Sequence, residues 1–234
     1  MMAAVFFDVD DTLLDNYQAF KQTLTQLYPI DQINEEELRQ LYLTFRTDSE
    51  NIYARFQLSS KNEAEYVRWQ RIAKRFGKSD SLNHLQQADE IYHVYQYQGR
   101  LSQDFIELFQ FLDRQSIQVG VLTNGFQAAQ QRKIDQLQLD NYIDPNWLLI
   151  SESFGVAKPE IACFEKLRSL LPDSVEQFIY LGDSYRNDIA PSLAAGWQPI
   201  WLNRFREKQR LEGMIEVTNK TEAIETIKQL IFTE

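Results

Sequence analysis

Five short runs of mostly apolar residues recur along this chain and set the narrowest limits on its fold. They are AAVFFDV (3–9), IQVGVLTNG (117–125), WLLIS (147–151), QFIYLGDS (177–184) and QPIWLN (198–203). Strands with one solvent-facing side alternate apolar and polar residues, whereas strands buried on both faces are apolar almost throughout. These runs are of the second kind, so we expect them to form a sheet that is covered on both faces.

Stretches with apolar residues at helical spacing separate these runs. They cover residues 101–115, 127–139, 159–171, 188–196 and 221–232. A chain in which strands alternate with helices builds a mostly parallel sheet, because parallel neighbours need a crossover connection. We therefore predict an α/β chain whose core is a Rossmann-like, doubly wound, mostly parallel sheet.

One long segment interrupts this alternation directly after the first predicted strand. Residues 16–98 contain no strand-like run, only one proline (Pro29) and only one glycine (Gly77), and their apolar residues recur at helical spacing. We predict that this segment is an inserted, all-helical cap domain. The catalytic core domain would then comprise residues 1–15 and 99–234.

The charge of the chain limits its partners. Of its 234 residues, 34 are acidic and 24 are basic, which gives a formal net charge of −10. Such a chain repels nucleic acid polymers and anionic membranes on average, and it has no apolar run long enough to span a bilayer. Its single cysteine, Cys163, cannot form an internal disulfide. We expect a cytoplasmic monomer or homodimer whose partner is a small molecule.

Polar side chains gather where the predicted strands end, and in the loops that follow them. The candidates are Asp8, Asp10, Thr123, Asn124, Lys158, Asp183 and Asp188. In open α/β sheets, ligands bind beyond the carboxyl ends of the strands. We therefore expect these seven residues to converge on one edge of the sheet and to form the functional site.

Such a set of residues suits phosphate chemistry. Closely spaced carboxylates repel each other by roughly 4 kcal/mol per pair at an effective dielectric constant near 20, and a hard cation such as Mg²⁺ relieves this repulsion. A phosphate could then be held by the metal, a lysine, a hydroxyl and the backbone amides of a turn. One carboxylate could attack phosphorus to form an aspartyl-phosphate, while a second one handles the proton.

Four short motifs occur in a fixed order along the chain, namely DVDDT, LTNG, AKP and GDSYRND. In this order and at these predicted strand ends, they resemble the four motifs of the haloacid dehalogenase (HAD) superfamily. The resemblance covers essentially the whole chain. The helical insertion after the first strand is also similar to the C1-type cap of that superfamily.

The resemblance implies a role for each matching residue. Asp8 would be the nucleophile and a metal ligand, and Asp10 the general acid and base, which binds metal through its backbone carbonyl. Thr123, together with the amide of Asn124, would hold the phosphoryl group. Lys158 would neutralise both the nucleophile and the phosphate.

In the last motif, the resemblance implies that Asp183 is a ligand of Mg²⁺ and that Asp188 supports the metal shell or Lys158. The implied activity is that of a Mg²⁺-dependent phosphomonoesterase, which acts through an aspartyl-phosphate on a small phosphorylated metabolite. Within the superfamily, the stretches LTNGF, SESFGVAKP and WLN are most similar to the bacterial pyrimidine/nucleoside 5′-monophosphatases.

Several other functions remain open at this stage. The substrate could be a sugar phosphate or flavin mononucleotide, and a phosphomutase would carry the same motifs. A dehalogenase is disfavoured because the dehalogenases of the family lack the second aspartate, which is Asp10 here. A non-catalytic binding protein is disfavoured because an unused cluster of acids costs stability.

Simpler roles are expected for some residues near and outside the motifs. Asp188 could instead cap the helix that follows it, and the Thr12 hydroxyl could stabilise the turn after the first strand. We expect His84 and His93 to be exposed or satisfied helix residues, and Cys163 to be buried and inert.

The aromatic residues of the cap would mostly form its core, with one or two left to stack on a nucleobase. In the basic run NRFREKQR (203–210), Arg204 or Arg206 could attract an anionic substrate, although a solvated loop is the simpler interpretation.

Overall fold

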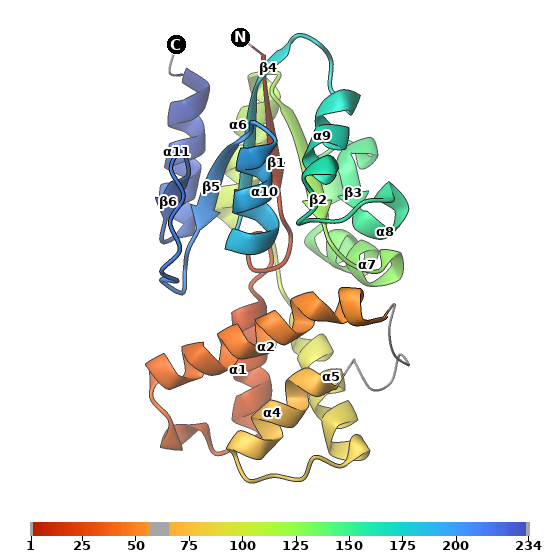
Figure 1. Cartoon of the computed structure of the whole chain (residues 1–234), viewed down its shortest axis with the longest axis vertical. Coiled ribbons are helices and arrows are strands. Elements are labelled where there is room, and N and C mark those ends of the chain that lie inside the picture. Colours follow the sequence, from red (N-terminus) through yellow and green to blue (C-terminus); the bar gives the residue numbers. More distant parts are fainter. Residues whose placement is uncertain (1, 57–65, 233–234) are drawn as a thin grey trace. The chain divides into compact units, whose positions relative to one another are not determined.

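The structure is a computed structural model that describes residues 2–56 and 66–232 (Figure 1). The chain divides into two compact units. We call residues 1–14 and 100–234 the core unit, and residues 15–99 the helical unit.

The core unit is built on one six-stranded sheet with the order β3-β2-β1-β4-β5-β6, in which every neighbouring pair is parallel. The strands are β1 (Met2–Phe7), β2 (Gln118–Thr123), β3 (Leu148–Ile150), β4 (Val175–Gly182), β5 (Gln198–Leu202) and β6 (Ile215–Val217). Strand β6 was not expected from the sequence. It has three residues, one of them the exposed Glu216, which is too short for a periodic pattern.

Helices and short helical turns connect these strands, and one more helix follows the last strand. They are α6 (Gln103–Arg114), α7 (Gln127–Leu137), η2 (Leu139–Asn141), η3 (Pro145–Trp147), α8 (Ser151–Phe154), α9 (Ile161–Leu170), η4 (Tyr185–Ile189), α10 (Ala190–Ala194) and α11 (Lys220–Phe232). The turn η4 has π-helical hydrogen bonding.

Strand β1 shows why the sheet is buried on both faces. Its side chains point alternately to opposite sides. Val5 and Phe7 lie in a core cluster with apolar residues of α6 and α11, whereas Ala4 and Phe6 lie in a second cluster with residues of α9. Figure 1 shows helices on both sides of the sheet. The predicted doubly wound α/β class is therefore confirmed, and the run AAVFF is apolar throughout because both of its faces are covered.

The helical unit consists of α1 (Asn16–Leu27), η1 (Ile30–Gln32), α2 (Glu35–Phe56), α4 (Val67–Arg75) and α5 (Leu82–Gln96). Aromatic side chains fill its core, as expected, and they come from four different helices. The buried rings on these helices belong to Phe20, Tyr42, Phe45, Trp69 and Tyr92, and that of Tyr28 lies just after α1. Tilted and edge-to-face contacts join them, such as the one between Phe45 and Trp69, whose ring centroids are 4.7 Å apart.

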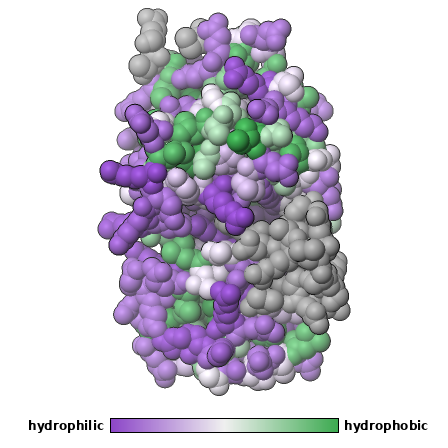
Figure 2. All heavy atoms as spheres, in the orientation of Figure 1, coloured by the Kyte–Doolittle hydropathy of each residue, from purple (hydrophilic) through white to green (hydrophobic). Residues whose placement is uncertain are grey.

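The face drawn in Figure 2 is mainly hydrophilic, and its apolar residues appear in small groups. Among the helices that the structure describes, none is both long and apolar enough to cross a membrane.

Candidate active site

The order of the strands explains how distant motifs meet. Strand β1 lies between β2 and β4, so the carboxyl ends of these three parallel strands are neighbours. Asp8 directly follows β1, Thr123 ends β2 and Asp183 directly follows β4. The backbone amide of Asp8 donates a hydrogen bond of 2.9 Å to the carbonyl of Leu181, which extends the ladder and fixes the point where the Asp8 side chain emerges.

Lys158 lies at the centre of the site. Its Nζ atom is 2.7 Å from Asp8 Oδ1, 2.6 Å from Asp188 Oδ1 and 2.8 Å from the Tyr180 hydroxyl oxygen. The Tyr180 hydroxyl in turn donates to the carbonyl of Leu122 in β2, at 2.8 Å. Lys158 is only 4% exposed, so its charge is balanced by these partners and not by bulk water.

Tyr180 was not among the residues predicted for the site. It lies within the apolar run of β4, where sequence reasoning assigned it only to the buried core. A tyrosine in a fully buried strand does carry one signal, because its hydroxyl needs a hydrogen-bond partner.

Asp188 is held by the loop that contains it. Its Oδ2 atom accepts a hydrogen bond of 2.9 Å from the backbone amide of Ser184, while Oδ1 faces Lys158. The alternative that Asp188 caps the following helix is wrong, because the N-cap of α10 is Ile189, no side chain bonds that helix start, and Asp188 lies within η4. Gly182 makes room for the carboxylate, since a Cβ atom there would lie 2.4 Å from Asp188 Cγ.

Three carboxylates form the acidic part of the site. Each of Asp8, Asp183 and Asp188 is buried and offers an oxygen, and these oxygens lie within 4.8 Å of one another. Burial raises the pKa of Asp8 to about 7. The Lys158 ammonium lowers it, and the carboxylates of Asp188 and Asp10 raise it. Three buried carboxylates therefore lie close together, and Lys158 bonds two of them. Such a set of hard oxygen donors fits Mg²⁺.

Asp10 has its own partners, which sequence reasoning missed. Lys133 Nζ lies 2.7 Å from both of its carboxylate oxygens, and Gln130 Nε2 donates to Oδ2 at 3.0 Å. Both residues belong to α7 and are buried, with Ile134 and Leu137 on the same helix. Gln130, Lys133, Ile134 and Leu137 follow the i, i+3, i+4, i+7 pattern of a buried helix face. Two polar residues in such a pattern are the signal that could have revealed them.

The turn after β2 is held by side chains on both sides. The Thr123 hydroxyl donates to Gln130 Oε1 at 3.3 Å, and the Gly125 amide donates to the Ser151 hydroxyl at 3.0 Å. The Asn124 side chain clamps Lys158, because its Oδ1 accepts from the Lys158 amide at 3.0 Å and its Nδ2 donates to the Lys158 carbonyl at 2.6 Å. The side chain of Asn124 therefore binds a loop, and the prediction that its backbone amide holds phosphate stays a prediction.

The turn after β1 is not stabilised by the Thr12 hydroxyl in the way that the sequence predicted. The Thr12 hydroxyl oxygen is buried, and within the described part of the chain it has no hydrogen-bond partner. The turn is instead shaped by backbone bonds from the amides of Leu13 and Leu14 to the carbonyl of Val9, and by Asp11, which adopts a left-handed φ of 61°.

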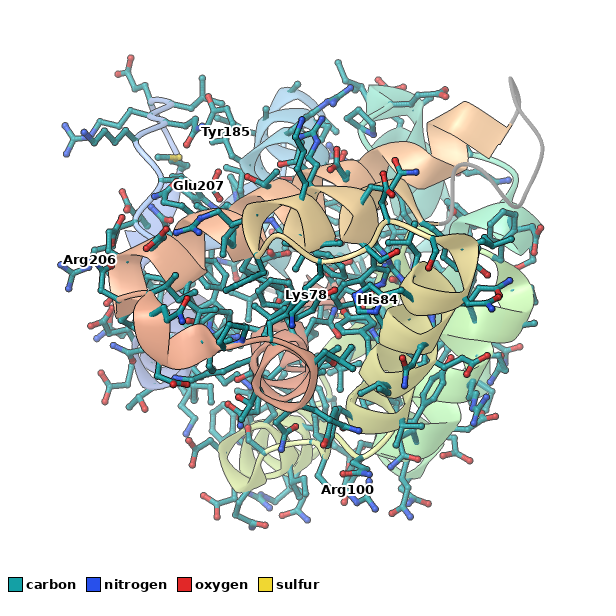
Figure 3. All side chains as sticks on the ribbon, turned by 90° about the horizontal axis from the view of Figure 1, so that it is seen from below. Lys78, His84, Arg100, Tyr185, Arg206 and Glu207 are labelled. Carbon is teal, nitrogen blue, oxygen red and sulfur yellow. The ribbon has the colours of Figure 1, made fainter. Side chains whose placement is uncertain are left out.

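The two histidines and the cysteine have the simple roles expected of them. His84, labelled on α5 in Figure 3, lies 3.0 Å from the Tyr28 hydroxyl through Nε2. His93 is 3.1 Å from the side-chain oxygen of Gln96 through Nδ1. Cys163 is fully buried, and burial raises the pKa of its thiol to about 11.

The loop after β5 carries the basic run. Asn203 holds this loop, because its Nδ2 donates to the Glu207 carbonyl at 2.9 Å and to Glu216 Oε1 at 2.7 Å. Figure 3 shows Arg206 and Glu207 on this loop, at the periphery of the view. A role of Arg204 or Arg206 in attracting an anion stays a prediction.

Comparison with known proteins gives a family match over most of the chain. The family model for haloacid dehalogenase-like hydrolases matches residues 2–196, which include all seven predicted site residues.

Two characterised relatives share part or all of this length. Pyrimidine 5′-nucleotidase YjjG of Escherichia coli is 33% identical over 119 residues, which are 50% of this chain and 51% of YjjG, so this chain spans about half the length of that relative. Ribulose-1,5-bisphosphate 5-phosphatase of Halopiger xanaduensis is 23% identical over 98% of this chain and 97% of its own.

A solved structure supports the fold. YfnB of Bacillus subtilis, assigned as a HAD-hydrolase and bound to magnesium, superposes with a TM-score of 0.69 at 20% identity and covers 99% of both chains.

Proposed function

Because this chain belongs to the haloacid dehalogenase-like hydrolases, we propose that it is a Mg²⁺-dependent phosphomonoesterase that acts through an aspartyl-phosphate on a small phosphorylated metabolite. One observation carries the proposal. A buried lysine, Lys158, joins Asp8, directly after β1, to Asp188 in η4, and Asp183 adds a third buried carboxylate to the cluster. A divalent cation held by these carboxylates would offset their charge and that of a bound phosphoryl group.

Each residue of the cluster has a task in the first step. An oxygen of Asp8 attacks phosphorus while the bond to the leaving-group oxygen breaks, and the carboxyl group of Asp10 gives its proton to that oxygen. Lys158 keeps Asp8 oriented and offsets the charge on the phosphoryl oxygens. Asp8 and Asp183 would hold Mg²⁺ together with the backbone carbonyl of Asp10, and the bound ion would neutralise the charge of phosphate.

The second step returns the enzyme to its starting state. The Asp10 carboxylate takes a proton from water, whose oxygen attacks phosphorus, and the bond between phosphorus and Asp8 breaks. Inorganic phosphate leaves, with Asp8 again ionised and Asp10 again protonated. The Thr123 hydroxyl and the Asn124 amide would hold the phosphoryl group in both steps, because the turn that carries them is fixed by Gln130 and Ser151.

For the substrate we propose a nucleoside 5′-monophosphate, and the support is the 33% identity to a pyrimidine 5′-nucleotidase. A sugar phosphate is the second candidate, because a ribulose bisphosphate phosphatase aligns over nearly the entire chain. Both are phosphate esters of a primary alcohol, so the same two aspartates would serve either one.

The test is the release of inorganic phosphate from a panel of nucleotides, sugar phosphates and flavin mononucleotide. Each compound is assayed with Mg²⁺, with EDTA, and with Asp8→Asn as the blank. We expect metal-dependent release that is lost in the variant. A phosphate-transferring mutase would instead accumulate phospho-aspartate and release little phosphate, and the absence of both signals would refute the proposal.

A further inference from the structure

Two buried residues of α7 bind the carboxylate of Asp10 through hydrogen bonds. Lys133 Nζ is 2.7 Å from both of its oxygens, and Gln130 Nε2 is 3.0 Å from Oδ2. Lys133 is 8% exposed and Gln130 is 5% exposed. A lysine is rarely buried to this degree unless an anion balances its charge, so the position of Asp10 is part of the reason that Lys133 can lie there.

Gln130 connects Asp10 to the turn after β2. Its Nε2 also donates to the Asn124 carbonyl at 3.0 Å, and its Oε1 accepts from the Thr123 hydroxyl at 3.3 Å. Gly125 makes this approach possible, because a Cβ atom there would lie 2.8 Å from Gln130 Nε2. One side chain therefore ties the second aspartate to the turn proposed to hold the phosphoryl group.

The two aspartates after β1 are served by different lysines. Asp8 is bound by Lys158, which lies in the loop before α9. Asp10 is bound by Lys133, which lies in α7. Separate lysines keep the two carboxylates apart, which suits their different tasks.

We propose that Lys133 and Gln130 are positioning residues that fix the Asp10 carboxyl group where it can reach the leaving-group oxygen. This inference rests on the proposed function, because it assigns the two residues a task in that reaction. They act through Asp10 and make no contact of their own with the substrate.

The leaving group supplies a sensitive test. p-Nitrophenolate departs without a proton, whereas the alkoxide of an alkyl phosphate needs one. We expect Lys133→Met to lower kcat/KM about 10²-fold for the best alkyl phosphate of the panel, and less than about 3-fold for p-nitrophenyl phosphate. Lys133→Arg, which restores a cation, should recover part of the lost activity. A merely structural defect would lower both substrates together.

Gln130→Met serves as a second probe that removes the amide and keeps the size of the side chain. It should lower kcat/KM about 10-fold for alkyl phosphates and less for p-nitrophenyl phosphate. This variant can test the proposal even if Lys133→Met does not fold. In an Asp10→Asn background, Lys133→Met should cause no further loss, because Lys133 acts through the Asp10 carboxyl group, which this background already lacks. Lys228→Met, the same substitution on α11 beside Phe111, is the matched control and should leave both activities unchanged.

Equal loss on both substrate classes, no loss on either, or an additive loss in the Asp10→Asn background would overturn the positioning role while the phosphatase itself stands. Failure of the unmodified protein to release phosphate from any compound would overturn the proposed function, and this inference with it. The two failures are distinguished by the unmodified protein alone.

Discussion

The core unit and the helical unit each bury an ion pair, and the two pairs differ in the ratio of carboxylates to cations. In the core unit, Lys158 is shared by two carboxylates, Asp8 and Asp188. In the helical unit, the carboxylate of Asp89 is bound by the Arg68 guanidinium. Both sets are nearly inaccessible to water, so the difference lies in how many opposite charges surround each acid.

The pKa values report this difference with opposite signs. Burial raises the pKa of Asp8 to about 7, and further carboxylates add to the effect against a single lysine. Burial also acts to raise the pKa of Asp89, but Arg68 and His93 together lower it below the ordinary value of an aspartate. Asp89 receives a further hydrogen bond of 2.8 Å from Trp69 Nε1.

The comparison separates a structural pair from a functional one. The pair in the helical unit is complete within the fold, because a cation and neutral donors satisfy its acid. In the core unit, Lys158 serves two carboxylates and a third lies beside them, and groups with perturbed pKa values of this kind concentrate at functional sites. The following experiments test this contrast, beginning with the largest expected effect.

Substituting the unbalanced acid should abolish activity and spare the fold. We expect Asp8→Asn to lower phosphate release by at least about 10⁴-fold, because no nucleophile remains. The free energy of unfolding should fall by less than about 1 kcal/mol, or rise, because one of several repelling carboxylates loses its charge. Phosphate assays and urea unfolding followed by circular dichroism measure the two quantities. The exposed Asp173→Asn is the control, and a variant that unfolds or keeps its activity would contradict the prediction.

The balanced acid should give the opposite result. Asp89→Asn removes the charge of the carboxylate that the buried Arg68 guanidinium binds, so we expect the free energy of unfolding to drop by about 3 kcal/mol. Glu90→Gln, at the next and exposed position of α5, should change it by less than about 0.5 kcal/mol. Urea titrations of the three proteins decide the matter. Equal stability of the two variants would mean that the Arg68–Asp89 pair contributes nothing to the fold.

Magnesium should stabilise the protein through the cluster of the core unit. At about 100 times its dissociation constant, a ligand that binds only the folded state adds about 2.7 kcal/mol, which is a rise of roughly 5–10 °C in the midpoint of thermal unfolding. Asp183→Asn should remove most of this shift, whereas the exposed Asp113→Asn should keep it. Thermal scans with Mg²⁺ and with EDTA measure the shift without any substrate. A shift that persists in Asp183→Asn would place the ion elsewhere.

The parallel sheet explains why much of the site could be predicted from the sequence. All carboxyl ends of such a sheet lie along one edge, so polar residues that end neighbouring strands must meet there. Asp8, Thr123 and Asp183 could be identified in this way before any distance was known, and Lys158 was predicted from its place in the loop between the third strand and the next helix. The fold class followed from the same runs, because buried strands and amphipathic helices leave different periodic patterns.

The features of the site that the sequence did not reveal belong to residues that do not end a strand. Lys133 and Gln130 reach the site from the middle of α7. The composition of this helix is mostly polar, so its buried face is not evident unless the residues are sorted by helical spacing. The Tyr180 hydroxyl is hidden in an apolar run, and its two partners depend on packing across the sheet. Strand β6 pairs only with β5, over three residues. These features depend on contacts between elements that are distant in the sequence, and the local pattern of apolar and polar residues does not encode such contacts.

The smallest expected effect is the response of the helical unit to acid. Because the pKa of Asp89 is lowered in the folded protein, its contribution to stability is fully present above the unfolded value of about 3.9 and is lost as the pH falls toward the folded value. The difference in unfolding free energy between the unmodified protein and Asp89→Asn should be constant above about pH 5. It should shrink by about 1 kcal/mol for each pH unit below about 4, and subtracting the variant removes the contributions of other acids. A difference that grows as the pH falls would show that the folded protein raises this pKa, and the two buried networks would then be alike.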